Sequence, residues 1–387
     1  MLVNAEFLQR NGYRTAIILE NGAALSSSET PAACIKRLFG YQFDDVRIGW
    51  GDIPKADIVV ATIWYSAKTV RDLPFDCKKV YFVQDWEACF NPMGDTYIFA
   101  ENSYRYGLIP ITTGKWLKHE LYSRFNVPGL ATDFCVATNI YRELPNVQRE
   151  LAVCFICQPE KPRRGAVLGV EALGIVNYLM PHVKIYLYGS KEKINVWYPH
   201  EGLGLLNQQE CNALYNRSSV GLCISSSNPS RIPFEMMAAG LPVVELYRNN
   251  TLYDLPIGGC LLCDQTPESL AEGIIQILNN ESQRMAMSQA ARAFMADKDI
   301  QLSLNQFVDA IKIIESGGQV VMNEQSLPVP IYTDAPVVAG PFVNTVPKDL
   351  GRIVRRRKSD LPTALRWLRW FFVRTTRAVK AFAAAYA

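Results

Sequence analysis

The sequence has few histidines and no apolar run of about 18 residues, the length that a membrane-spanning helix needs. Its three histidines, His119, His182 and His200, lack the spacing of metal ligands, which argues against a zinc site or a Ser-His-Asp hydrolase. The strings G-x-x-x-x-G-K-[ST] and G-x-G-x-x-G are also absent, so neither a P-loop nor a simple dinucleotide site is indicated. We expect no metal and no membrane span.

Ten cysteines are scattered along a chain that does not open with a secretory pattern, which favours reduced thiols in the cytoplasm. Cys154 with Cys157, and Cys260 with Cys263, form two C-x-x-C pairs. A zinc ribbon would bring two such pairs within about 20 residues of each other, and these are much further apart. We therefore expect the four cysteines to be buried as small hydrophobic residues.

Charge is distributed unevenly along the 387 residues. Residues 351–387 carry ten Lys and Arg against one acid, a charge of +9 that leaves −6 for the rest of a chain whose net charge is +3. An acidic body argues against nucleic-acid binding, whereas a basic end with Trp and Phe at helical spacing predicts an amphipathic helix on an anionic membrane surface. A helix that binds a partner protein is the alternative. The expected membrane-contact residues are Arg355, Arg356, Arg357, Trp367 and Trp370.

Apolar strand-like runs alternate with helical patterns, which is typical of βαβ units and a parallel sheet. The alternation predicts an α/β protein with a Rossmann-like domain at 1–143, a second one at 144–316, a Pro-rich linker at 317–350 and the basic tail at 351–387. Periodic helices over residues 266–316 are expected to close the second domain.

The chain opens on a short helix that ends at Gly12. A doubly wound domain normally begins with a central strand and a glycine-bearing turn ahead of such a helix, and neither is present. The first strand of the first domain is therefore expected to be missing, because it is supplied from elsewhere or because the chain is truncated.

A polar loop, Ser225 to Pro233, follows an apolar strand and leads into a helix with Glu235 in its first turn. Anionic ligands settle at such strand ends in open α/β sheets. Glu235 could then accept hydrogen bonds from the hydroxyls of a ribose, although an acid in a first turn is equally explained by the helix dipole.

The string from Pro233 to Val244, with Glu235 ahead of Met-Ala-Ala-Gly-Leu-Pro-Val-Val, resembles the nucleotide-sugar signature of family 4 glycosyltransferases. The resemblance implies the GT-B fold, two Rossmann-like domains facing a cleft, and gives Glu235 the donor ribose. An acid that usually stands eight residues upstream is Ser227 here, followed by Asn228. In this departure the sequence resembles bacterial rhamnosyltransferases that build surface polyrhamnose from dTDP-rhamnose.

Further donor-binding residues are expected around the same cleft. Arg163 and Arg164 stand at a strand-to-helix turn, where guanidinium groups can bind a pyrophosphate; a solvated basic turn is the alternative. The family's usual arginine in this loop is Gln158 here. Gly189 and Ile232 complete the expected donor site.

In the first half, two acids follow a buried strand at Asp85 and Glu87. Asp85 is the candidate catalytic residue, which would contact the transferred sugar or the acceptor hydroxyl, and a plain turn is the alternative. Glu87 and Arg105 are expected near the cleft edge.

The resemblance implies a retaining glycosyltransferase, without a metal cofactor, that passes rhamnose from a nucleotide sugar to a cell-surface polysaccharide or lipid-linked glycan, and the basic tail places it at the inner face of the membrane. A non-catalytic sugar-binding or scaffolding subunit is the first alternative, suggested by Ser227 and the missing strand. A GT-B epimerase is the third hypothesis.

Overall fold

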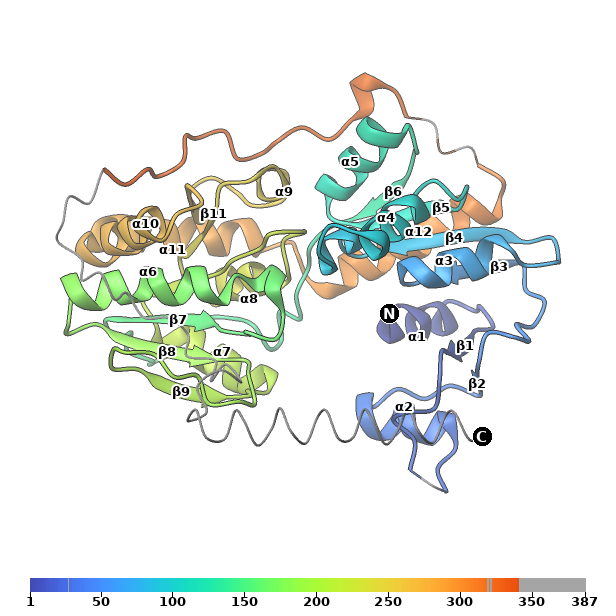
Figure 1. Cartoon of the computed structure of the whole chain (residues 1–387), viewed down its shortest axis with the longest axis horizontal. Coiled ribbons are helices and arrows are strands. Elements are labelled where there is room, and N and C mark those ends of the chain that lie inside the picture. Colours follow the sequence, from blue (N-terminus) through green and yellow to red (C-terminus); the bar gives the residue numbers. More distant parts are fainter. Residues whose placement is uncertain (27, 319, 321, 341–387) are drawn as a thin grey trace, which may run out of the picture.

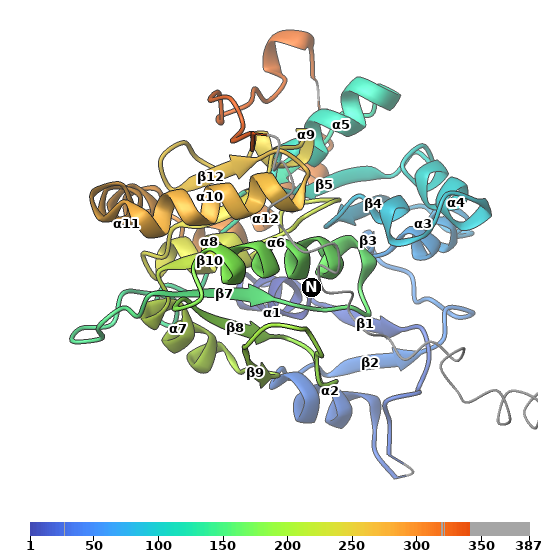
Figure 2. The same ribbon diagram turned by 60° about the vertical axis from the view of Figure 1, so that its left-hand side comes forward.

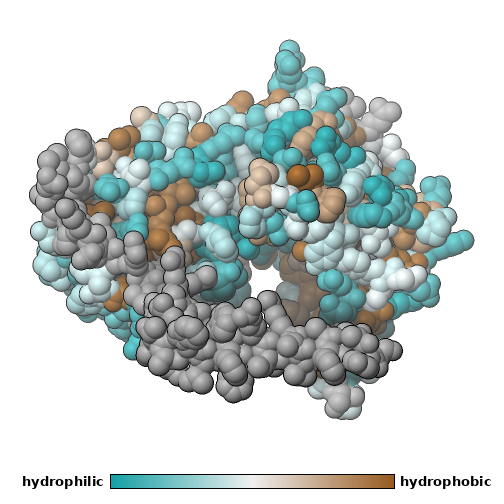
Figure 3. Space-filling view, in the orientation of Figure 1, coloured by the Kyte–Doolittle hydropathy of each residue, from teal (hydrophilic) through white to brown (hydrophobic). Residues whose placement is uncertain are grey.

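The structure is a computed structural model that describes residues 1–340 apart from 27, 319 and 321. The described residues form two α/β halves lying side by side, which confirms the predicted fold class (Figure 1). None of their helices is long and apolar enough to cross a lipid bilayer. The surface seen in Figure 3 is largely hydrophilic, with hydrophobic residues scattered over it. The predicted membrane-contact residues lie outside the described part of the chain.

A parallel sheet in the order β3-β4-β5-β6 forms the centre of the first half. Val80 to Val83 in β4 are buried, as expected for a strand covered by helices on both faces. The strands are β3 (Ile58–Ala61), β4 (Lys78–Val83), β5 (Ile109–Thr113) and β6 (Leu130–Thr132). The accompanying helices are α3 (Trp64–Arg71), α4 (Asp95–Ser103) and α5 (Lys115–Phe125), with a short 3₁₀ turn η1 (Glu87–Phe90).

Two further strands of the first half, β1 (Ala16–Leu19) and β2 (Asp45–Ile48), form a separate parallel pair. Helix α1 (Leu2–Arg10) precedes this pair and α2 (Pro31–Phe39) connects its strands. Figure 1 and Figure 2 both show the pair standing apart from β3 and β4. The first half thus contains two sheets within the described residues, where a doubly wound domain would have one.

The second half has a six-stranded parallel sheet in the order β12-β11-β10-β7-β8-β9. Its strands are β7 (Ala152–Ile156), β8 (Lys184–Tyr188), β9 (Glu201–Gly204), β10 (Val220–Leu222), β11 (Val243–Leu246) and β12 (Cys260–Cys263). Its helices are η2 (Pro162–Arg164), α6 (Ala166–Leu179), α7 (Gln208–Arg217), α8 (Ile232–Ala238), α9 (Asn249–Leu252), α10 (Pro267–Asn279) and α11 (Glu281–Met295). The four cysteines of the C-x-x-C pairs are buried in this half, as predicted.

Helix α12 (Ile300–Glu315) departs from the prediction that residues 266–316 close the second domain. Its apolar residues Phe307, Ile311 and Ile314 pack against Val80 and Phe82 of the first sheet. The periodic apolar pattern correctly indicated a helix, but it carries no information about which sheet that helix covers. The chain therefore crosses back to the first half after α11.

The Pro-rich stretch expected to be a linker makes ordered contacts in its described part. The Tyr122 hydroxyl donates to the Met322 carbonyl at 3.1 Å, on the first half. Tyr332 is buried in the second half, where the Leu262 amide donates to its hydroxyl at 3.1 Å. Around the short turn η3 (Glu324–Ser326), this segment therefore runs along both halves, as the orange trace in Figure 1 shows.

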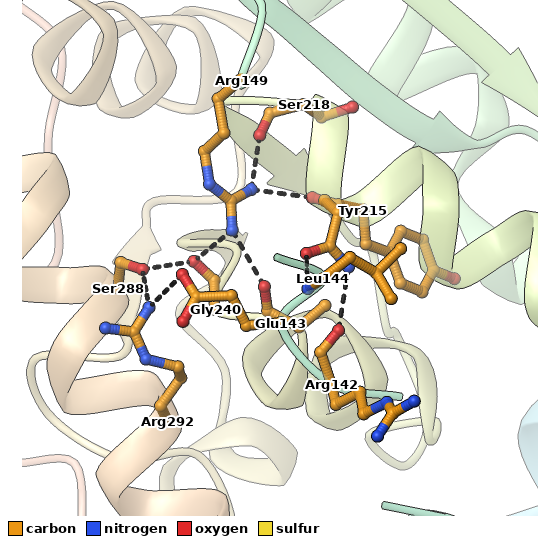
Figure 4. A network of polar contacts seen from close by, with 11 residues as sticks. Arg142, Glu143, Leu144, Arg149, Tyr215, Ser218, Gly240, Ser288 and Arg292 are labelled. Carbon is orange, nitrogen blue, oxygen red and sulfur yellow. Dashed lines mark hydrogen bonds and ion pairs between the residues drawn. The ribbon is translucent and has the colours of Figure 1, made fainter. Parts of the chain in front are cut away.

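Arg149 joins the carboxyl ends of α7 and α8 (Figure 4). Its Nη1 donates to the carbonyls of Tyr215 and Ser218 at 2.8 and 2.7 Å, and its Nη2 donates to those of Ala239 and Gly240 at 2.9 and 3.0 Å. The last carbonyls of a helix have no partner within it, and a cation there is favoured by the helix dipole. One guanidinium thereby fixes α8 relative to α7.

Candidate functional site

The candidate site lies where turns at the carboxyl ends of strands from the two sheets meet. Asp85 follows β4 of the first sheet, Arg163 and Arg164 follow β7 of the second, and the loop at 225–231 follows β10. Such strand-to-helix turns lie at the carboxyl edge of a parallel sheet, where ligands of open α/β folds bind. Contacts between the two sets of turns show that the edges face each other.

Asn228 is the most direct link between the halves. Its side-chain amide donates to the carbonyls of Gln84 and Thr113, at 3.0 and 3.1 Å, at the ends of β4 and β5. The residue is 5% exposed, and its Oδ1 is buried with no hydrogen-bond partner among the described residues. Asn228 was expected to bind the donor, and here it joins the two sheets while keeping one acceptor unused.

Asp85 lies next to two of the predicted donor residues. Its Oδ2 is 3.8 Å from Nε of Arg163, and the Ser227 hydroxyl hydrogen-bonds to the same carboxylate. Burial raises the pKa of Asp85 above its usual value, although Ser227 and Arg163 oppose the shift. The Arg163 guanidinium also stacks over the ring of Phe90, 4.2 Å from its centre. Asp85, Arg163 and Ser227 thus form one cluster across the two halves.

The turn that presents the two arginines depends on Gly165. This residue has φ +53°, and a Cβ at its position would lie 2.4 Å from Cγ2 of Ile224. A larger residue would therefore displace the turn from β10. Nε of Arg164 is buried and has no partner in the described structure, so this guanidinium retains an unused donor.

Glu235 lies in the first turn of α8, as predicted. Its carboxylate accepts a hydrogen bond from Tyr141, and Arg231 and Arg164 are the neighbouring cations. Burial raises the pKa of Glu235 to about 7, although all three neighbours act against the shift. The carboxylate therefore changes its charge near neutral pH and becomes a stronger acceptor for hydroxyl groups when it ionises.

Two buried acids hold the loops around this cluster. Glu245 in β11 accepts from the Ser225 amide at 2.9 Å and from the Ser225 hydroxyl at 2.8 Å. Asp254 accepts from the amides of Lys115 and Trp116 at 2.8 and 3.2 Å, so it caps α5 of the opposite half. Burial raises the pKa of Asp254 to about 6. The first acid shapes the loop after β10, and the second fixes the first half against the second.

The remaining two predicted donor residues, Gly189 and Ile232, lie in the second half. Gly189 follows β8, and its carbonyl accepts from Nε2 of Gln158 at 3.0 Å. Ile232 is the first residue of α8 and packs against the hydrophobic core of the second half. Both lie at the carboxyl edge of the second sheet.

Two expectations for the first half require correction. Glu87 is 3% exposed, and its Oε2 accepts from the Trp64 amide at 2.6 Å and from the Tyr81 hydroxyl at 2.9 Å, so the carboxylate faces the core instead of the cleft. Burial raises its pKa to about 8. Arg105 follows α4 and precedes β5, a helix-to-strand turn, so it lies at the amino edge of the sheet. Its guanidinium bonds to Oδ1 of Asn102 at 2.7 Å.

Four residues of the site were not identified from the sequence as contributors: Tyr141, Arg231, Glu245 and Asp254. Arg231 stands next to the motif that contains Glu235, so proximity could have suggested it. Glu245 directly follows the same motif, whereas Tyr141 and Asp254 had no sequence signal. In the described residues, no group of three or more His, Cys, Asp or Glu side chains is arranged to hold a metal ion.

Residues 151–275 match the family model described as WsaF, C-terminal domain. The chain is 30% identical over 239 residues to the O-antigen biosynthesis protein RfbC of Myxococcus xanthus. This alignment covers 60% of the chain but only 19% of RfbC, so the chain spans about a fifth of the length of that relative.

Solved structures show the same fold at low identity. Sucrose-phosphate synthase from Thermosynechococcus elongatus superposes with a TM-score of 0.59 at 13% identity, covering 81% of this chain and 92% of that one. Anabaena Alr3699/HepE in complex with UDP and glucose gives 0.58 at 12% identity, covering 78% and 99%. The chain has the GT-B fold, as expected from the resemblance.

Proposed function

We propose that the protein is a retaining glycosyltransferase that transfers a sugar from a nucleoside-diphosphate donor to a glycan acceptor in the synthesis of a cell-surface polysaccharide. The observation that carries the proposal is the convergence of Glu235, Arg164 and Arg231 with the Asp85 cluster where the halves meet. The similarity to an O-antigen biosynthesis protein supports the acceptor class, and HepE with UDP and glucose supports the donor class.

The two ends of the donor have different binding partners in this proposal. Arg164 binds the diphosphate, because its guanidinium is close enough to Glu235 to influence that carboxylate and its Nε has no other partner. Glu235 accepts hydrogen bonds from the ribose hydroxyls. Stabilising the charge of the departing nucleoside diphosphate and holding the sugar in line with the acceptor supply the catalysis.

The transferred sugar is proposed to be rhamnose, delivered as dTDP-rhamnose. At the position where the resembling family has an acid, Ser227 supplies a hydroxyl that bonds to Asp85. A 6-deoxy sugar has one hydroxyl fewer to bind, which suits a site with fewer acceptors. Asp85 is the residue proposed to contact the sugar or the acceptor hydroxyl.

Residues 351–387 are proposed to hold the enzyme at an anionic membrane surface, because ten cations alternate with large apolar residues there. Each Lys or Arg near such a surface contributes about 1 kcal/mol. An acceptor carried on a membrane lipid would then be within reach.

A non-catalytic sugar-binding subunit is the second candidate. Its specific support is the ion pair between Asp85 and Arg163, which engages the proposed catalytic acid with a cation expected to bind the donor. Both candidates bind a nucleotide sugar, so turnover with a glycan acceptor separates them.

The first test is a thermal-shift comparison of dTDP, dTDP-rhamnose, UDP and GDP. A ligand that binds only the folded state raises the melting temperature of the protein. We expect shifts with dTDP and dTDP-rhamnose alone. A shift with UDP or GDP but not with dTDP would reject dTDP-rhamnose as the donor and retain the enzyme class, and no shift with any nucleotide would reject donor binding.

The pH dependence of the same binding tests Glu235. Its ionised form is the better acceptor, so donor affinity should rise as the pH passes through about 7. Glu235→Gln should weaken binding by about tenfold and remove that dependence. Glu281→Gln is the matched control, because Glu281 occupies the first turn of α11 and its side chain is 79% exposed. Equal effects of the two substitutions would contradict the ribose role.

A further inference from the structure

A cluster of three aromatic side chains lies just beyond the carboxyl ends of β2 and β3. Trp50 follows β2, and Trp64 and Tyr65 follow β3 as the first two residues of α3. The rings of Trp50 and Tyr65 stack with their centres 5.6 Å apart, and Trp64 meets Tyr65 edge to face at 5.2 Å. The Tyr65 hydroxyl donates to Oε2 of Glu20, the residue after β1, at 3.1 Å. These contacts join the ends of β1 and β2 to that of β3, which lies above them in Figure 1.

This aromatic cluster is accessible to solvent. Its three rings are only partly buried and Glu20 is exposed, whereas Trp86 of the same half is buried in the core. Within the described residues, the indole nitrogens of Trp50 and Trp64 have no hydrogen-bond partner, and neither nitrogen is fully buried. The cluster therefore combines partly exposed rings with two N–H groups that are free to donate and a carboxylate that can accept.

The aromatic cluster is also fixed in place relative to Asp85. β3 and β4 are neighbours in a parallel sheet, so Trp64 and Asp85 stand at the same edge of that sheet. Glu87, two residues after Asp85, accepts from the Trp64 amide at 2.6 Å and from the Tyr81 hydroxyl at 2.9 Å. This buried carboxylate ties the start of α3 to the turn after β4. A ligand held by the rings would therefore lie at a defined position relative to Asp85.

We propose that Trp50, Trp64, Tyr65 and Glu20 form a subsite for a neutral pyranose sugar of the acceptor chain, an inference that rests on the proposed function and specifies its acceptor. One face of a pyranose ring consists of C–H groups that pack on aromatic rings, while its hydroxyls need hydrogen-bond partners. The two indoles supply donors and Glu20 supplies an acceptor. Because the charged group in contact with the rings is an anion, a neutral sugar fits better than an acidic or phosphorylated one.

Packing of β1 and β2 against α3 is a purely structural explanation of the same contacts. It accounts for the stacking of the rings, but it gives no role to the free N–H groups of Trp50 and Trp64 or to the exposed carboxylate of Glu20. The two explanations predict different results when sugar binding and nucleotide binding are measured on the same variants.

The experiment measures the binding of neutral oligosaccharides, one of α-linked rhamnose and one of α-linked glucose, to the full chain by saturation-transfer NMR and calorimetry. The variants are Trp64→Ala and Glu20→Gln. Trp197→Ala is the matched control, because Trp197 is 44% exposed in the second half and also meets a tyrosine ring edge to face. The affinities for dTDP and UDP are measured on every protein, which tests the donor site and the integrity of the fold.

We expect the unmodified chain to bind at least one oligosaccharide, with saturation transferred to the C–H protons of the sugar. Trp64→Ala should weaken this binding about tenfold and Glu20→Gln about threefold, without a change in nucleotide affinity. Trp197→Ala should change neither affinity.

Two results would overturn the proposal: no oligosaccharide binding by the unmodified chain, or equal oligosaccharide affinity in the unmodified chain and Trp64→Ala. Loss of both affinities in Trp64→Ala, with Glu20→Gln unaffected, would also overturn it and assign the cluster to packing. A chain that binds an oligosaccharide through Trp64 but binds no nucleotide would reject the proposed donor and retain the sugar subsite.

Discussion

Replacement of Arg149 by methionine should cause one of the largest losses of stability available in the second half. Methionine keeps an unbranched apolar stem but removes all four hydrogen bonds to the carbonyls of Tyr215, Ser218, Ala239 and Gly240. Burial lowers the pKa of Arg149, yet a guanidinium remains charged in proteins. The substitution therefore removes a cation from two helix ends at once.

The loss of stability depends on whether each of the four carbonyls keeps another hydrogen-bond donor. Hydrogen bonds from charged donors contribute about 1.5 to 3 kcal/mol each, but they are not additive when one group makes them all. The Gly240 carbonyl keeps the Ser288 hydroxyl as a donor at 2.6 Å, so it is not left without a partner. We expect a loss of about 4 kcal/mol for Arg149→Met and about 2 kcal/mol for Arg149→Lys, which retains the charge without the planar fork.

Differential scanning calorimetry is the assay, with Arg292→Met as the matched control from the same network (Figure 4). The Arg292 side chain is 37% exposed and bonds to Glu143 at 3.0 Å, so its removal should cost less than about 1 kcal/mol. Arg149→Met should lower the melting temperature by about 10 °C. A decrease no larger than that of Arg292→Met would refute the assignment of Arg149 as the link between α7 and α8.

Three more predictions concern the core of the first half, the contact between the halves, and the basic tail. Because the folded-state pKa of Glu87 is raised from 4.5 to about 8, its protonated form adds stability below about pH 4.5 that is lost as the pH rises through 8. Glu87→Gln should flatten the fall of melting temperature between pH 5 and 9, a difference on the order of 4 kcal/mol at most, and an unchanged slope would contradict this role. Asn228→Ala should cost about 2 kcal/mol and enlarge the radius of gyration in small-angle scattering, because it removes both bonds to the first sheet; an unchanged radius and stability would count against the link. A chain ending at residue 350 should no longer sediment with anionic vesicles, and retained sedimentation would show that the tail is not the membrane contact.

The parts of the fold that could be predicted are those set by short stretches of sequence. The apolar run at 151–156 and the helical pattern at 166–179 correspond to β7 and α6 almost residue for residue. β2, with the sequence Asp-Val-Arg-Ile, could not be predicted in this way, because a short and half-polar strand gives no apolar run. The sheet that α12 covers could not be predicted either, because the apolar periodicity of the helix is the same whichever sheet it packs against.

The candidate site also contains residues that could be predicted from the sequence and residues that could not. Arg163, Arg164 and Glu235 could be located because each follows a recognisable strand, and topology brings such turns to one edge. Glu87, only two residues after Asp85, turns inward because its carboxylate accepts from the Trp64 amide of α3, a contact that no local pattern reveals. Arg105 precedes β5, so the order of the elements already places it at the amino edge of the sheet, away from the turns that form the site.

The relative placement of the halves depends on backbone groups that each half leaves without a partner of its own. Helix α5 begins after Gly114, which has no side chain to cap it, and Asp254, 139 residues away in sequence from Lys115, accepts from the helix's first amides. The carbonyls at the ends of β4 and β5 likewise find their donor in Asn228. Sequence motifs are made of side chains, so they can indicate which turns form the site. The distance between those turns depends on backbone amides and carbonyls that find their partners in the other half. Because nearly every residue type has the same backbone groups, this distance cannot be predicted from sequence motifs.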